Sequence, residues 1–560
     1  MKRAVCLAWL AALLCLAGCA GSWFGDDHHS SRSAGATDER PAGDPAAVSV
    51  ADDDDDDDDA SPLFPKSPEP HHLIVIDGLN LTDAERLLFV SLQGVLAQTE
   101  PRLYFDPSPL PYNDGTHEEE GRWLTEMQTK WGVTSETAAD PWAVFDGFLG
   151  DVSGYVVYDP DLPQTVNVAT TLAGLRQAVI AHPDLIPALE GRGLPLVEDL
   201  RGRFADHVEL YTWAFAELWL DCNHEIMAFL QDGLMPLRDY LIAQRVFTLQ
   251  LDPHHYAERP LLEEILAATP RDIPILGWPL DELLGVILFS QYGKYLVAAD
   301  YTPNLSAHSG LPPLPITQEH VVDWPEVENR IHVAFAYTDG DSLAYANRWM
   351  PDWFDDPAYG ELPIGWELSC SLYDLAPDVL GFYYDRMDEN DFVLGPVSGV
   401  GYIYPNRYPD LDPFLAKSKT CLDRAAMRTL WLLNDDLTLS DDLANRYGAA
   451  LDLLGIYMDY WPTADKGWYF STNGTPVVHS QYTYLVGPEQ IGDILAEAAI
   501  AKEYFYPDVP TFVFIGVNGW VTSPTYIQSF VAGLDDRYRV VRPDALFAAM
   551  RAARERGWAR

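Results

Sequence analysis

The chain has 560 residues and carries 85 Asp and Glu against 36 Lys and Arg, which gives a formal net charge of −49. This acidic balance argues against nucleic acid as a partner, because binding to phosphates depends on Lys and Arg, and it keeps the protein soluble. Single cores stop growing near about 250 to 300 residues, so the chain is too long for one ordinary domain.

The first 18 residues have the features of a lipoprotein signal. Lys2 and Arg3 precede an apolar run, residues 4–16, that is shorter than the roughly 20 residues a membrane-spanning helix needs. Small residues then lead directly into Cys19. We therefore expect cleavage before Cys19 and a lipid bilayer partner through its acyl chains, with an ordinary secretory signal as the alternative. Ala20 favours sorting to the outer membrane and a location in the cell envelope, outside the cytoplasm.

Residues 19–70 are rich in Ser, Ala, Gly, Pro and Asp and include eight consecutive aspartates at 52–59. They contain too few large apolar residues to form a core, so we expect a disordered acidic linker. Three cysteines follow it, namely Cys222, Cys370 and Cys421. Cys370 and Cys421 could form a disulfide in an oxidising compartment, although their spacing does not show it, and buried packing cysteines are the default.

Residues 71–318 are predicted to form an N-terminal α/β domain. Thr82 is a candidate N-cap for an amphipathic helix over 84–98, and the stretch 170–250 is predicted to be mostly helical. The sequence has neither a G-x-G-x-x-G after a strand nor a Walker A loop, so we expect no nucleotide. The β-rich runs are 73–78, 103–105, 154–158 and 274–278.

A proline-rich linker at 310–315 leads into a C-terminal domain, residues 319–560. Its β-rich runs alternate with helical segments such as 441–451 and 488–503, the pattern of parallel β/α units. A seven- or eight-stranded, TIM-like β/α barrel is therefore the expected fold. The runs are 331–336, 364–368, 392–395, 429–433, 454–458, 476–479 and 511–515, with a short eighth at 540–541.

Active sites of β/α barrels lie at the carboxyl ends of the strands, so polar residues after each run are the candidates. Two carboxyl groups can cleave a glycosidic bond, one as proton donor and one as nucleophile or base. The candidate acids are Asp339, Asp341, Glu367 and Asp459. The candidate substrate contacts are Trp366, Ser398, Gly399, Gly401, Tyr402, Tyr404, Asp435, His479, Asn518 and Trp520.

Several of these residues have a purely structural interpretation. Asp341 or Ser342 could cap the helix that begins near Leu343, and Asp435 or Asp436 could start a turn. Glu367 interrupts an apolar run, so its carboxylate must face the barrel mouth or pair with an arginine. A lone histidine such as His479 is more often a satisfied polar residue than a metal ligand.

The segment Gly399-Val400-Gly401-Tyr402-Ile403-Tyr404-Pro405 matches the motif that names the GxGYxYP family of putative glycoside hydrolases. Thr338-Asp339-Gly340-Asp341, the stretch 76–105 and Asn304-Leu305-Ser306 also resemble that family, so the likeness spans nearly all of the folded chain. The resemblance implies a two-domain extracytoplasmic protein associated with polysaccharide processing, for which hydrolase activity is inferred.

The motif itself has two interpretations. Its glycines permit a tight backbone course or close ligand approach, and Tyr402 and Tyr404 would share one face of an extended segment and suit the face of a sugar. Alternatively, the motif is a structural bend that is filled by two core tyrosines.

Two other functions compete with hydrolysis. A non-catalytic glycan-binding lipoprotein would need the aromatic residues Trp366, Tyr402, Tyr404, Trp461 and Trp520 but not the acids. A metal-dependent deacetylase is disfavoured, because only His479 follows His332 and closely spaced histidines are absent. Residues 395–399 do not fit the serine-hydrolase pattern G-x-S-x-G. We expect a carbohydrate substrate and neither a metal nor another cofactor.

Overall fold

The computed structural model describes residues 61–108, 119–324, 326–458, 467–479 and 487–558, all within one compact unit, Asp59–Arg560. The predicted signal, Cys19 and most of the acidic linker lie outside these residues. In the described part of the chain, no helix is both long and apolar enough to cross a membrane.

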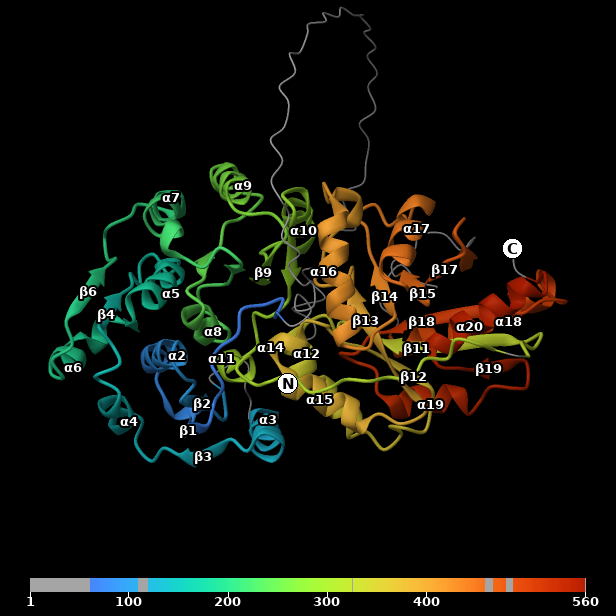
Figure 1. Ribbon diagram of the computed structural model, residues 1–560, viewed down its shortest axis with the longest axis horizontal. Coiled ribbons are helices and arrows are strands. Elements are labelled where there is room, and N and C mark those ends of the chain that lie inside the picture. Colours follow the sequence, from blue (N-terminus) through green and yellow to red (C-terminus); the bar gives the residue numbers. More distant parts are fainter. Residues whose placement is uncertain (1–60, 109–118, 325, 459–466, 480–486, 559–560) are drawn as a thin grey trace, which may run out of the picture. The chain divides into compact units, whose positions relative to one another are not determined.

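The described residues of the N-terminal part form three small parallel sheets, seen on the blue-to-green side of Figure 1. Their strand orders are β2-β1-β3, β5-β4-β6 and β10-β9-β7-β8. The strands are β1 (His72–Ile76), β2 (Leu103–Phe105), β3 (Thr134–Thr137), β4 (Gly154–Val157), β5 (Ala178–Ala181), β6 (Leu196–Asp199), β7 (Met227–Phe229), β8 (Phe247–Leu249), β9 (Ile273–Gly277) and β10 (Lys294–Val297).

The helices of this part pack against the sheets. Thr82 caps α2 with a complete capping box, in which Glu85 bonds back to the Thr82 backbone, so this predicted helix start is confirmed. The helices are α2 (Asp83–Ala97), α3 (Glu119–Glu126), α4 (Pro141–Gly147), α5 (Thr165–Arg176), α6 (Ile186–Glu190), α7 (His207–Leu218), α8 (Arg238–Ala243), α9 (Glu258–Ala268), α10 (Glu282–Gln291) and α11 (Leu305–His308).

The prediction that residues 170–250 are mostly helical was wrong. Strands β5, β6, β7 and β8 all lie within that stretch, each only three or four residues long. Apolar runs of this length cannot be distinguished from helix segments by periodicity alone. The three sheets share one hydrophobic cluster, which includes Ile76, Tyr155 and Phe229 from the first, second and third sheet.

The C-terminal part is built on one large sheet in the order β16-β17-β15-β14-β13-β12-β11-β18, with β19 paired to β11. All pairs are parallel except β16 with β17. Every predicted strand run is found here. The strands are β11 (Ile331–Tyr337), β12 (Ile364–Glu367), β13 (Asp391–Val397), β14 (Thr429–Leu432), β15 (Gly455–Met458), β16 (Trp468–Phe470), β17 (Pro476–His479), β18 (Thr511–Val517) and β19 (Tyr538–Val540).

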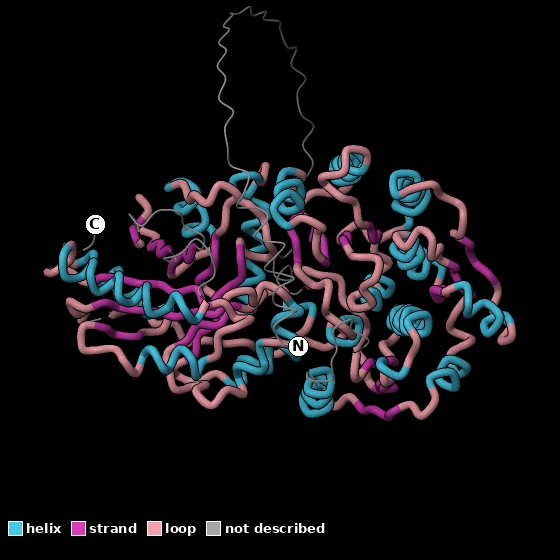
Figure 2. The backbone as a smooth tube through the Cα atoms, turned by 180° about the vertical axis from the view of Figure 1, so that it is seen from behind, coloured by secondary structure: helices cyan, strands magenta, loops and turns pink. Residues whose placement is uncertain are grey.

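Helices cover this sheet, and Figure 2 shows the strands lying together with helices along them. They are α12 (Leu343–Arg348), α13 (Met350–Phe354), α14 (Leu372–Leu375), α15 (Pro377–Arg386), α16 (Leu411–Arg424), α17 (Asp441–Ala450), α18 (Pro488–Tyr504), α19 (Pro524–Val531) and α20 (Pro543–Glu555).

The predicted closed barrel is not confirmed. In the described residues β17 and β18 are in contact, but no backbone ladder joins them. One face of the sheet packs on α20, where the Phe547 ring lies 4.7 Å from the Tyr457 ring. The α/β class with parallel strands is confirmed.

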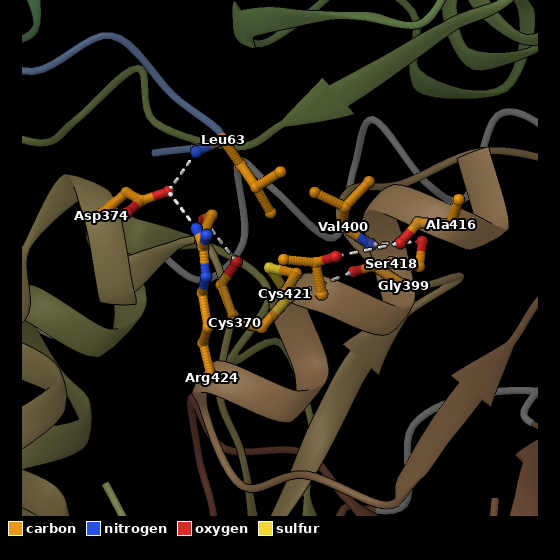
Figure 3. Close-up of a disulfide and its surroundings, with 12 residues drawn as sticks. Leu63, Cys370, Asp374, Gly399, Val400, Ala416, Ser418, Cys421 and Arg424 are labelled. Carbon is orange, nitrogen blue, oxygen red and sulfur yellow. Dashed lines mark hydrogen bonds and ion pairs between the residues drawn. A yellow bond between two sulfur atoms is a disulfide. The ribbon is translucent and has the colours of Figure 1, made fainter. Parts of the chain in front are cut away.

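Cys370 and Cys421 form a disulfide, with their Cα atoms 5.5 Å apart, and Cys222 is a buried free thiol. Figure 3 shows this bond tying the segment after β12 to α16. On one side Asp374 accepts a hydrogen bond from the Leu63 amide at 2.7 Å. On the other, Ser418 accepts one from the Val400 amide at 3.0 Å, so the disulfide lies beside the GxGYxYP segment.

Candidate active site

The loop that follows β11 carries two of the predicted acids, Asp339 and Asp341. Between them, Gly340 packs so closely on β12 that a Cβ there would lie 1.6 Å from the Glu367 carbonyl oxygen. Asp339 has a positive φ of 67°. The carbonyl of Gly340 also accepts a hydrogen bond from the Ser369 amide at 2.8 Å. Glycine is therefore required at 340, and the loop is fixed on the carboxyl end of the neighbouring strand.

The helix cap predicted at this loop is made by Ser342. Its Oγ accepts a hydrogen bond from the Tyr345 amide at 3.3 Å at the start of α12. Asp341 is therefore not the N-cap of α12, and both acids are only partly buried.

Trp520, in the loop after β18, contacts Asp339. Its indole Nε1–H donates to Asp339 Oδ2 at 2.6 Å, and the side chain is 43% exposed. The Tyr345 and Trp349 rings each lie 4.9 Å from the Trp520 ring. Asn518 accepts a hydrogen bond from the Trp520 amide at 3.0 Å and so holds the loop. An accessible aromatic surface beside carboxyl groups suits the apolar face and the hydroxyls of a sugar.

The surroundings of these acids favour their protonated forms. Burial raises the pKa of Asp339 to about 6, although the hydrogen bond from Trp520 opposes this rise. Burial, together with the charges of Asp339 and Glu282, raises the pKa of Asp341 to about 7. Carboxyl groups with raised and unequal pKa values are typical of acid–base sites.

Glu282 is a site residue that sequence reasoning missed. It opens α10 in the third N-terminal sheet region, directly after Asp281, which caps that helix by accepting from the Leu284 amide at 2.7 Å. Surrounding protein and the charges of Asp339 and Asp281 raise its pKa, while a hydrogen bond from Tyr402 lowers it. The local sequence is that of an ordinary acidic helix start, so only the packing of the two parts of the chain identifies it.

The two tyrosines of the GxGYxYP segment are buried, with 5% and 4% exposure for Tyr402 and Tyr404. Their rings pack edge to face at 5.5 Å within the hydrophobic cluster of the N-terminal part. Gly401 is close to β10, where a Cβ would lie 2.6 Å from the Tyr295 ring. These placements match the alternative of a structural bend with core tyrosines rather than a surface for a sugar.

Glu367 and Trp366 also lie in the core. Glu367 is 3% exposed, and its Oε1 accepts a hydrogen bond from the Val397 amide at 3.1 Å. Trp366 is fully buried, stacks on Tyr337 at 4.7 Å and donates to Asp391 at 2.8 Å. The expected position of Glu367 at an open mouth is therefore not observed, since its carboxylate ties β12 to β13.

Of the other candidates, Ser398 and Gly399 lie in the bend between β13 and α16, and Asp435 lies in the loop after β14. Ser398 donates to the Ile403 carbonyl at 2.7 Å, and Gly399 has a φ of 125° with no room for a Cβ beside Ser418. Asp435 accepts from Arg407 at 2.5 Å. Partial burial works to raise its pKa, but hydrogen bonds from Arg407 and Asn406 outweigh this and hold the pKa below its usual value.

Asp436 makes the predicted turn by accepting from the Thr438 amide at 3.0 Å. His479 is buried and stacks on Tyr469 at 5.6 Å. Asp459 and Trp461 lie outside the described residues. Among the residues that are described, no group of three or more His, Cys, Asp or Glu is arranged to hold a metal ion.

The fold and site define an α/β protein with partly buried acids and an exposed aromatic residue at the carboxyl ends of parallel strands. Residues 329–551 match the family described as GxGYxYP putative glycoside hydrolase C-terminal domain. Residues 72–149, 152–223 and 224–310 match the first, second and third GxGYxYP N-terminal domains. The chain therefore belongs to the GxGYxYP family.

Each of the three N-terminal matches contains one of the three small sheets, β1 to β3, β4 to β6 and β7 to β10. The fold is similar to the crystal structure of a putative hydrolase from Bacteroides thetaiotaomicron VPI-5482, with a TM-score of 0.76. That likeness covers 88% of this chain and 98% of the other at 24% identity, and it shows the fold alone. The search of curated proteins gave no match.

Proposed function

We propose that the protein hydrolyses glycosidic bonds of a polysaccharide, with Asp339 and Asp341 as its catalytic carboxyl groups. The observation that carries this proposal is the position of the two acids on one loop, where the exposed indole of Trp520 donates a hydrogen bond to Asp339. The family to which the chain belongs, described as putative glycoside hydrolases, supports the same reaction class.

The two carboxyl groups take different roles because their surroundings differ. Asp341, with a pKa of about 7, keeps its proton near neutral pH and donates it to the oxygen of the leaving sugar. Asp339 receives the Trp520 N–H, which stabilises its ionised form, and it acts as nucleophile or activates water. The ring of Trp520 holds the sugar against this pair.

The substrate would be met outside the cytoplasm. The signal-like segment ending at Cys19 supports a lipid-anchored protein of the cell envelope, and the acidic linker would give the folded part reach. The Cys370–Cys421 disulfide supports the same location, since disulfides persist in oxidising compartments.

The test is the release of new reducing ends from a panel of purified polysaccharides. Wild-type protein should release them from at least one member, and Asp339→Asn should abolish that release. Asp436→Asn, which alters only an exposed turn, is the control. Binding of a polysaccharide with no release by the wild type would instead indicate a glycan-binding protein without catalysis.

A further inference from the structure

The GxGYxYP segment pairs with the third N-terminal sheet. The Tyr402 amide donates to the Leu296 carbonyl at 2.8 Å, and the Leu296 amide donates to the Tyr402 carbonyl at 2.9 Å, which forms an antiparallel bridge at the end of β10. Gly401 permits this approach, because a Cβ there would lie 2.8 Å from the Leu296 carbonyl oxygen. The segment therefore fixes the C-terminal part of the chain on the third N-terminal domain.

The same segment holds α10 at both ends. At its start, the Tyr402 hydroxyl donates to Glu282 Oε1 at 3.1 Å, and the Tyr404 hydroxyl lies 3.0 Å from that of Tyr402. Near its end, Ser290 Oγ accepts a hydrogen bond from the Tyr404 amide at 2.9 Å. Tyr402 and Tyr404, two buried tyrosines of the C-terminal domain, thus fix the position of α10 in the third N-terminal domain. They thereby also fix Glu282, which lies at the start of that helix.

We propose that Tyr402 positions Glu282 beside Asp339 and Asp341, so that the third N-terminal domain supplies a carboxylate to the hydrolytic site. This inference rests on the proposed function. It assigns the family's signature tyrosine to the assembly of a site across two domains, and it makes Glu282 and Tyr402 positioning residues that act through Asp341.

Glu282 acts on Asp341 through its charge. Glu282 is exposed and is held by the Tyr402 hydroxyl, and the other titratable groups near enough to interact with it electrostatically are Asp281 on its own helix, Asp339 and Asp341 on the loop after β11, and Tyr404 on the motif. Asp281 is itself paired with His254 at 3.3 Å. A negative charge at Glu282 disfavours ionisation of Asp341 and so preserves the proton that Asp341 donates.

The test is a ¹³C NMR titration of carboxyl groups in the full chain, with signals assigned by their loss in Glu282→Gln and Asp341→Asn. Glu282→Gln should lower the titration midpoint of Asp341 by at least roughly 0.5 pH unit, because a neighbouring negative charge is removed. Tyr402→Phe should raise the midpoint of Glu282, because its ionised form loses a hydrogen bond.

Tyr408→Phe is the matched control, because the Tyr408 hydroxyl also reaches the third domain, at Asp272, but does not contact Glu282. It should leave both midpoints unchanged. The inference is overturned if Glu282→Gln leaves Asp341 unchanged, or if Tyr402→Phe leaves Glu282 unchanged. The titration needs no substrate, so a chain that hydrolyses no polysaccharide yet shows both shifts would refute the proposed function alone.

Discussion

The indole of Trp520 and the carboxylate of Asp339 are joined by a hydrogen bond of 2.6 Å between loops that follow neighbouring strands, β18 and β11. This bond lowers the pKa of Asp339 against the effect of burial. Because the indole is also exposed, one side chain both stabilises the ionised acid and presents a ring to solvent.

Trp520→Phe keeps an aromatic ring but removes the N–H donor. The pKa of Asp339 should rise, so the acidic limb of the kcat/KM profile should move to higher pH, and kcat should fall about tenfold, in proportion to one lost charge-assisted hydrogen bond. Trp324→Phe, in the segment before β11 where Trp324 packs on Arg539, should change neither quantity. An unshifted acidic limb in Trp520→Phe would show that the bond has no electrostatic role.

Asp341→Asn should stabilise the fold at pH 8 and not at pH 4. The pKa of Asp341 is about 7 in the folded chain and near its ordinary, lower value when unfolded, so the folded state loses stability as pH rises between these values. Asparagine does not ionise, so Asp341→Asn does not lose this stability as pH rises. Each pKa unit corresponds to about 1.4 kcal/mol, and for a partly exposed group we expect a gain on the order of 1 to 3 kcal/mol.

Calorimetric unfolding at the two pH values measures the effect of Asp341→Asn. Asp435→Asn should change stability in the opposite direction, because hydrogen bonds from Arg407 and Asn406 hold the pKa of Asp435 below its usual value. The stabilisation that ionised Asp435 provides is present above the ordinary aspartate pKa and disappears as pH falls through the lower pKa of the folded state. Asp435→Asn should therefore be less stable than wild type at pH 8. Equal melting temperatures of Asp341→Asn and wild type at pH 8 would contradict the raised pKa.

Gly401→Ala should separate the motif from β10. The added methyl group would meet the Tyr295 ring at 2.6 Å and the Leu296 carbonyl at 2.8 Å, both within the packed interior. Such overpacking costs about 1 to 3 kcal/mol, which chemical denaturation can measure. Gly150→Ala has open space around its Cβ and should be neutral. A Gly401→Ala chain as stable as wild type would mean that the motif does not hold the two parts together.

Loss of the disulfide should lower stability. Cys370 and Cys421 are 51 residues apart in the sequence, and closing a loop of this length restricts the unfolded chain by roughly 4 kcal/mol in the entropy model. Double replacement by Ser should therefore lower the denaturation midpoint, and a reducing agent should have no further effect on the variant. Cys222→Ser, at a free thiol, should keep the response to reductant.

The strands of the C-terminal sheet could be predicted because each is a buried apolar run such as Ile331–Tyr337, and such runs are distinct in a sequence. Whether the sheet closes into a barrel could not be predicted, because closure depends on pairing between strands far apart in the sequence, such as β17 and β18. Strands β5 to β8 were missed because three or four apolar residues fit a helix equally well.

Asp339, Asp341 and Trp520 could be identified because parallel strands place their following loops at one edge of the sheet. Two interpretations stayed open for Tyr402 and for Glu367, because a sequence does not show whether an aromatic ring or a carboxylate near a strand end is buried. Glu282 gave no signal of its own, since it lies 57 positions before Asp339 and reaches it only through packing between domains.

The roles of the two acids are tested most directly by comparing two substrates of different leaving-group ability. On the polysaccharide that the wild type cleaves, Asp339→Asn and Asp341→Asn should both be inactive. On the matching 2,4-dinitrophenyl glycoside, whose leaving group needs no proton, Asp341→Asn should retain activity and Asp339→Asn should not. Wild-type rates of polysaccharide cleavage in both variants would contradict the assignment of Asp339 and Asp341 as the catalytic pair.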